Sequence, residues 1–93
     1  MGDAREETQM KDYDQTVGIA WVNRAYREGR IGHADMEELL NFVLTYSMYE
    51  AMVRNEYDKL LIGNSGWPKQ EDAHAAVLAG ILEDLEAKKR RVV

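Results

Sequence analysis

Length, composition and charge limit what this chain can be. It has 93 residues, no cysteine, and 17 acidic against 12 basic side chains, which gives a formal net charge of −5 at pH 7. The length predicts a single domain, and the lack of cysteine excludes disulfide bonds and thiolate metal sites. The acidic balance disfavours nucleic acid as a partner. No run of about 20 apolar residues that could span a bilayer is present, so membrane insertion is not expected.

The first residues are polar and acidic. We expect residues 1–8 to form a flexible N-terminal tail and residues 9–93 to form a single helical domain. The tail does not resemble a signal peptide, so a cytoplasmic location is expected.

Apolar residues recur at helical spacing through residues 9–28. They are Met10, Tyr13, Val17, Trp21 and Ala25. Spacing of three or four residues predicts a helix, and Gly29 follows where a left-handed residue commonly ends one. The alternative is a strand over 16–22 (TVGIAWV), but the rest of the chain offers it no comparable partner strand.

Residues 34–61 are the most apolar part of the chain and predict one long central helix. The stretch 35–61 contains neither Gly nor Pro, and its apolar side chains fall on two faces of a helical projection. Such a helix must be covered from more than one side. We therefore predict an all-α fold: an antiparallel bundle of three helices, about 9–28, 34–61 and 68–90, completed by self-association into a homodimer or larger assembly. The self-association surface is assigned to Leu44, Met48, Ala51 and Met52.

One carboxylate lies on the main apolar face of this expected helix. Glu50 projects there among residues such as Leu39 and Val43. A carboxylate in such a place must be paired, hydrogen-bonded, protonated or at a rim. Pairing with Lys11, Arg54 or a tyrosine hydroxyl would make it structural, and a role as general acid or metal ligand is the alternative.

A third helix is expected over 68–90. The segment 63–66 (GNSG) predicts a loop, and Pro68 suits the first turn of a helix. The buried stripe of this helix comprises Val77, Leu78, Ile81, Leu82 and Leu85. His74 lies on the same stripe, which predicts a histidine at the edge of the core, bonded to a backbone carbonyl or to Tyr57.

A metal site is the alternative reading of the same histidine. Glu71 stands three residues before His74, and this Glu-x-x-His spacing resembles the ligand pairs of ferritin-like helices. Within one chain, Glu50 would lie about 10 Å away along the bundle. The alternative site therefore consists of Glu50, Glu71 and His74, assembled across a dimer.

Aromatic side chains anchor many protein interfaces. The partner-binding candidates are Tyr26, Tyr49 and Trp67, whereas the aromatic residues on apolar stripes are assigned to the core: Tyr13, Trp21, Tyr46 and Tyr57. The basic run 88–91 (KKRR) is expected to stay solvated at a helix C-terminus, where it complements the helix dipole.

No set of residues in the sequence suggests catalysis. There is no serine or histidine arrangement typical of a nucleophile, and the loop 63–66 lacks the Lys-Ser/Thr of a phosphate-binding loop. We therefore expect no enzymatic activity and no cofactor. The expected function is binding to another protein or complex, of the inhibitor, immunity or adaptor type that phages and mobile elements encode. The resemblance to such proteins is one of size and charge alone.

Overall fold

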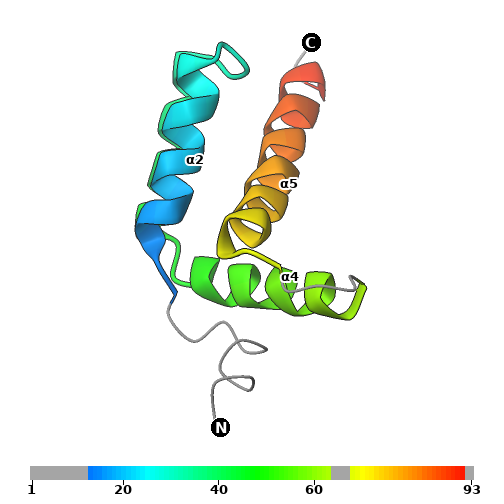
Figure 1. Ribbon diagram of the computed structural model, residues 1–93. Coiled ribbons are helices and arrows are strands. Elements are labelled where there is room, and N and C mark those ends of the chain that lie inside the picture. Colours follow the sequence, from blue (N-terminus) through cyan, green and yellow to red (C-terminus); the bar gives the residue numbers. More distant parts are fainter. Residues whose placement is uncertain (1–12, 64–67, 92–93) are drawn as a thin grey trace, which may run out of the picture.

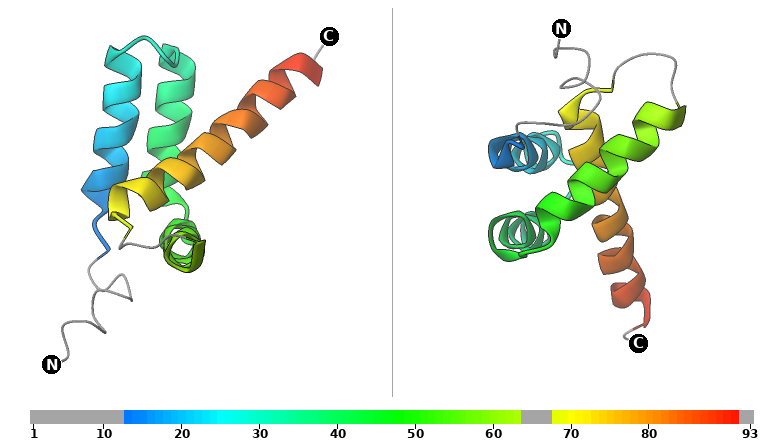
Figure 2. Two further views of the ribbon diagram at one scale, coloured as in Figure 1. Left: turned by 45° about the vertical axis from the view of Figure 1, so that its right-hand side comes forward. Right: turned by 90° about the horizontal axis from the view of Figure 1, so that it is seen from below.

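The computed structural model describes residues 13–63 and 68–91, and all regular structure in these ranges is helical. The helices are α2 (Gln15–Arg27), α3 (His33–Thr45), α4 (Tyr49–Gly63) and α5 (Gln70–Arg91). Helices α2 and α3 lie side by side and antiparallel (Figure 2). Helix α4 runs across one end of this pair, and α5 lies obliquely to the α2–α3 pair (Figures 1 and 2). The expected all-α class is confirmed. None of these helices is long and apolar enough to cross a membrane. The expected tail 1–8 and the first residues of the expected first helix lie outside the described residues.

Helix α2 begins and ends where the sequence provides the caps. The Asp14 carboxylate accepts a hydrogen bond from the Thr16 backbone nitrogen at 3.0 Å and so caps the helix. At the other end Gly29 has a φ of 77°. The nitrogens of Gly29 and Arg30 donate to the carbonyls of Tyr26 and Ala25, which is the Schellman pattern. The predicted left-handed stop at Gly29 is therefore confirmed, and the chain reverses into α3.

The prediction of one central helix over 34–61 is wrong, and with it the count of three helices. Residues 46–48 separate α3 from α4, and Tyr46 has extended backbone angles. The Thr45 hydroxyl donates to the Asn41 carbonyl at 2.7 Å. Thr, Tyr and Ser are weaker helix formers than the Leu, Met and Glu around them, and hydroxyl bonds to the backbone compete with the helical ladder. A continuous helix of this length would also extend about 40 Å, far beyond the 13-residue α2 that covers it.

The break explains the two apolar faces seen in the sequence. Helix α3 buries Leu39 and Val43, and α4 buries Tyr49, Val53 and Tyr57, each set spaced four residues apart. The two faces therefore belong to two helices that point in different directions. Glu50, expected on the apolar face, is instead exposed and pairs with Arg54 at 2.9 Å. The misplaced carboxylate was thus a sign that the helix does not continue.

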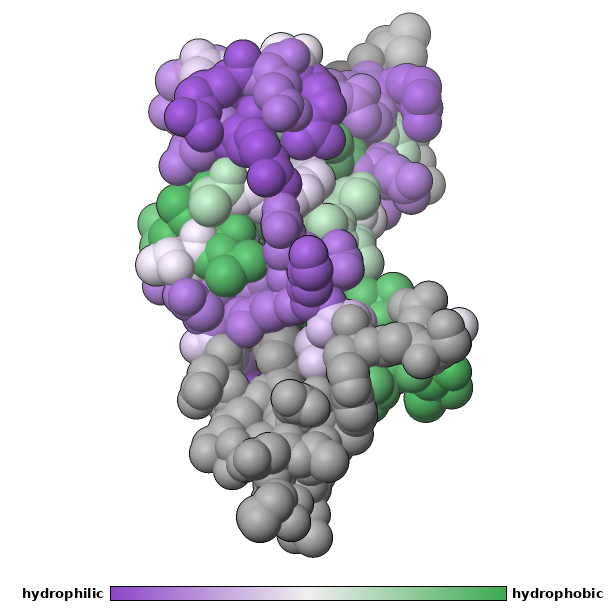
Figure 3. All heavy atoms as spheres, in the orientation of Figure 1, coloured by the Kyte–Doolittle hydropathy of each residue, from purple (hydrophilic) through white to green (hydrophobic). Residues whose placement is uncertain are grey.

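A single core joins all four helices. Its buried apolar residues are Trp21, Val22, Ala25, Ile31, Leu39, Val43, Tyr49, Val53, Tyr57, Ala73, Val77 and Leu78. Tyr13 packs half-buried against this core, whereas Tyr46, expected inside, is exposed. Polar groups also join the helices: Arg24 of α2 pairs with Glu71 of α5, and Lys89 of α5 reaches the buried Asp35 of α3 at 2.9 Å. The space-filling view shows a polar surface over the α2–α3 turn and the end of α5 (Figure 3).

Candidate functional site

The most enclosed polar cluster lies where α2, α4 and α5 meet. His74 has no exposed surface, and its Nδ1 lies 2.7 Å from the Tyr49 hydroxyl. Its Nε2 lies 3.1 Å from Oε1 of Gln70, which also accepts the Asp14 backbone nitrogen at 2.6 Å. Every buried side-chain nitrogen or oxygen in the described ranges has a hydrogen-bond partner. The cluster is therefore closed and fully satisfied.

The partners of His74 fix the position of its proton. A backbone nitrogen can only donate, so the Gln70 atom facing Asp14 is the amide oxygen. An amide oxygen can only accept, so His74 Nε2 carries the hydrogen. In a neutral imidazole, Nδ1 is then the acceptor for the Tyr49 hydroxyl. In a protonated ring, Nδ1 would instead donate to the hydroxyl oxygen.

Burial reinforces the neutral state of the cluster. It lowers the pKa of His74 to about 4, against a smaller opposite effect of the nearby Asp14. Burial also raises the pKa of Tyr49, and so does its neighbour Tyr13. The ring of Tyr13 stacks on His74 with 5.5 Å between centroids. A histidine held in this way is a structural hydrogen-bonding group rather than a proton carrier near pH 7.

Gly18 of α2 makes room for this cluster. A Cβ at this position would lie 2.8 Å from the Tyr49 hydroxyl oxygen and 2.9 Å from His74 Nδ1. The sequence analysis predicted His74 at the edge of the core, bonded to a backbone carbonyl or to Tyr57, whereas the structure buries its ring completely. The observed partner is Tyr49, which is buried at the start of α4 on the same face as Val53 and Tyr57.

The structure does not bring together the three residues of the alternative metal site. Glu50 pairs with Arg54, Glu71 pairs with Arg24, and both ring nitrogens of His74 are engaged. Within residues 13–63 and 68–91, no group of three His, Cys, Asp or Glu residues is arranged to hold a metal ion. His74 is also fully buried, so a second copy has no access to it in this conformation.

The three partner-binding candidates have different surroundings. Tyr26 is 40% exposed and contacts the His33 ring edge-on, with 5.9 Å between centroids. Tyr49 is only 1% exposed, so this conformation does not offer its ring to a partner. Trp67 lies outside the described residues. Of the two candidates within the described residues, Tyr26 is the one on the surface.

The expected self-association residues surround the corner between α3 and α4. Leu44 and Met48 are 54% and 53% exposed, and Tyr46 between them is 47% exposed. Ala51 is exposed, whereas Met52 is half-buried and packs against the core. We call these three exposed apolar residues between the end of α3 and the start of α4, Leu44, Tyr46 and Met48, the corner surface. Sequence reasoning assigned Tyr46 to the core and so missed its place there.

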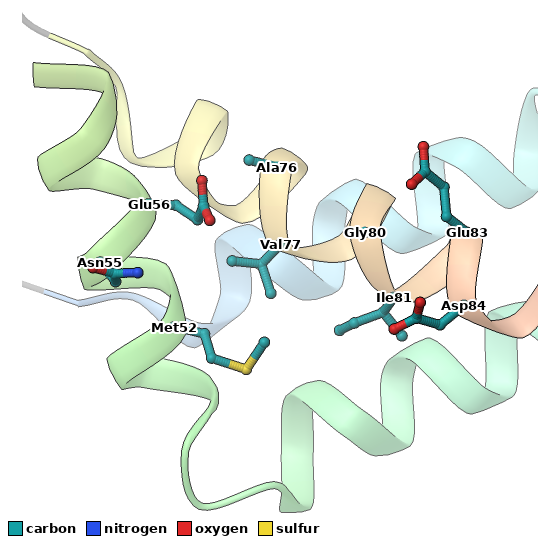
Figure 4. A pocket seen from close by; sticks show the side chains of 9 residues that line it. All are labelled: Met52, Asn55, Glu56, Ala76, Val77, Gly80, Ile81, Glu83 and Asp84. Atoms are coloured by element: carbon teal, nitrogen blue, oxygen red, sulfur yellow. The ribbon is translucent and has the colours of Figure 1, made fainter. Parts of the chain in front are cut away.

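A groove between α4 and α5 was not foreseen. It has a volume of about 420 Å³ and an apolar floor that includes Met52, Val77 and Ile81 (Figure 4). The signal for it in the sequence is the pair Ala76 and Gly80, four residues apart on one helix, next to the acidic residues Glu83 and Asp84.

Comparisons with protein-family models, with curated proteins and with solved structures found no match to this chain.

Proposed function

We propose that this protein acts without catalysis, by binding a surface of a larger protein, as inhibitors, immunity proteins and adaptors do. The corner surface carries the proposal. Leu44, Tyr46 and Met48 expose large apolar side chains next to one another in the chain. Large apolar side chains that are exposed in the same region of a small domain commonly mark an interaction site. The same surface is where we propose that two copies of the chain join.

The polar groups of the described residues support binding rather than chemistry. The enclosed histidine is neutral and satisfied, and the described ion pairs are mostly exposed side-chain pairs on the helix surfaces, such as Glu50 with Arg54. Surface pairs of this kind contribute little to stability. Binding through the corner would instead gain its free energy from burying apolar area.

The experiment replaces the corner and follows association. In a Leu44→Ser/Met48→Ser variant, we expect light scattering to show loss of self-association, and capture of the native partner from host extract to fall about tenfold. Ile62→Ser is the matched control, because Ile62 is 86% exposed at the far end of α4. The proposal fails if the corner variant, shown by circular dichroism to be folded, keeps both its assembly state and its partner capture.

A further inference from the structure

The groove between α4 and α5 has an apolar floor and an acidic rim. Met52 comes from α4, and Val77 and Ile81 come from α5 (Figure 4). Glu56 borders the groove on the α4 side, and Glu83 and Asp84 border it on the α5 side. Glu83 and Asp84 form no ion pair or hydrogen bond with any residue in the described part of the chain. Two carboxylates beside apolar surface are therefore not held in an ion pair within this part of the chain, although Arg90 lines a second, neighbouring groove together with them.

Gly80 lines the groove, and the packing of the domain itself does not require a glycine at this position. A Cβ on Gly80 would meet nothing within 4 Å, so no neighbouring group requires glycine here. Glycine inside a helix costs about 1 kcal/mol relative to alanine. Gly80 and Ala76 stand one turn apart on the same face, and small residues at this spacing let a second helix approach to the usual 8–10 Å between axes. The shape of the groove thus suits a helix laid against α5.

We propose that this groove binds a basic amphipathic helix of a partner protein. Its apolar side chains, spaced four residues apart, would rest on Met52, Val77 and Ile81 over the space beside Gly80. Its Lys or Arg side chains would pair with Glu83 and Asp84. The charge of the rim selects this occupant over an acidic helix, because like charges facing each other across an interface are unfavourable. The groove shares Met52 with the expected self-association residues but contains none of the three residues of the corner surface. Variants of the corner surface and of the groove therefore test the two proposals separately.

The first experiment compares two peptides. Fluorescein-labelled amphipathic peptide helices would share one leucine pattern and carry either Lys or Glu on the flanking positions, and anisotropy would measure their binding to the full chain. We expect saturable binding of a Lys peptide and binding at least tenfold weaker for its Glu counterpart. Raising the ionic strength from about 0.05 to 0.5 M should weaken the Lys peptide several-fold, since exposed charges are then screened. No saturable binding across a register-shifted series of Lys peptides, or equal binding of both kinds, overturns the proposal.

The second experiment locates the binding site. Gly80→Leu adds a large side chain beside the groove, at a position where its Cβ would meet nothing within 4 Å, and should weaken the Lys peptide at least tenfold. Ala79→Leu is its matched control, because Ala79 is exposed on the same helix but does not line the groove. Glu83→Lys/Asp84→Lys should weaken the Lys peptide about tenfold and strengthen the Glu peptide. Glu28→Lys, at the end of α2, is the control for surface charge reversal.

Three results, obtained with these variants and with the Leu44→Ser/Met48→Ser corner variant, would overturn the proposal. One is binding that falls equally in Ala79→Leu and Gly80→Leu. Another is binding lost in the corner variant but kept in Gly80→Leu, which would place the peptide at the corner. The last is self-association, measured by light scattering, that Gly80→Leu abolishes while the Lys peptide still binds, which would make a second copy the occupant. Circular dichroism of each variant confirms that the helices are retained.

Discussion

The two halves of α5 have opposite surroundings. In the first half, Ala73, His74, Val77 and Leu78 are all buried, and His74 is bonded to groups from α4 and from its own first turn. In the second half, from Ala79 onward, the apolar residues are at most half-buried, and Gly80, Glu83 and Asp84 face the groove. The first half of α5 thus packs into the core, and the second half borders the groove.

Because of this difference, we expect changes in the first half of α5 to affect stability and changes around the groove to affect binding. Changes in the first half disturb a closed hydrogen-bonded cluster, where an unpaired group cannot reach water. In the second half, changes on the side of Gly80 and Glu83 meet open space or solvent, where most substitutions cost little. The opposite side of this half still packs on the core through Leu82 and Leu85, and Lys89 pairs with the buried Asp35. Two glycines show the same difference. Gly18 of α2 packs against the buried cluster around His74, whereas Gly80 of α5 lies at the open groove.

The largest effect is expected from removing the buried imidazole. His74→Ala leaves a cavity and deprives the Tyr49 hydroxyl of its acceptor. We expect it to lower the free energy of unfolding by about 3–4 kcal/mol, measured by urea unfolding followed by circular dichroism. Glu83→Ala, in the second half of α5, should change it by less than about 0.5 kcal/mol. Similar losses in the two variants would contradict the contrast between the halves.

The second-largest effect is expected from acid, which should lower the free energy of unfolding through His74 in the first half of α5. The pKa of His74 is about 4 in the folded chain against 6.5 for a free histidine. The unfolded chain therefore takes up this proton first as the pH falls. The stability that the neutral ring contributes is fully present above about pH 6.5 and is lost progressively toward pH 4, by up to about 3 kcal/mol.

Urea unfolding at several pH values measures this loss. The slope between pH 6.5 and 4 should be much reduced in His74→Gln and retained in His33→Gln, because His33 is exposed beside Glu37. An equal slope in wild type and His74→Gln would show that other groups cause the acid sensitivity.

A smaller loss is expected from filling the space beside the cluster. In Gly18→Ala, the added Cβ would approach the Tyr49 hydroxyl oxygen and His74 Nδ1 to within 3 Å. The cost of displacing that hydrogen-bonded pair should exceed the gain in helix propensity. We therefore expect the free energy of unfolding to fall by about 1–2 kcal/mol. Chemical denaturation gives the value, and a stabilised Gly18→Ala variant would mean that the cluster yields easily.

The smallest effect has the opposite sign. Gly80→Ala adds a methyl group where nothing lies within 4 Å and should raise the free energy of unfolding by about 0.5–1 kcal/mol, as for an exposed helix interior. The thermal midpoint measures this gain. A destabilised Gly80→Ala variant would reveal a tight contact at Gly80 and remove the open groove.

Local signals predicted the start and end of elements better than their number. The stop at Gly29 follows from the nearby residues. The break at residues 46–48 has no glycine or proline to announce it, and it depends on which helices are available to cover each face. Glu50 on an apolar face was the visible sign of it. The partner of His74 could not be predicted because Tyr49 and Tyr57 lie on the same face of α4, and only the packing of α4 against α5 decides which of them reaches the imidazole. The groove depends on how α4 and α5 cross, which their separate sequences do not specify.

The bond between the Asp14 nitrogen and Gln70 joins residues 56 positions apart. It ties the first turn of α2 to the first turn of α5. During synthesis, the α2–α3 pair can close through short-range contacts as soon as it leaves the ribosome, but this tie must wait for α5 to emerge. We therefore expect a nascent chain arrested before Gln70 to be cleaved readily near Asp14 by protease, and one arrested after α5 to resist.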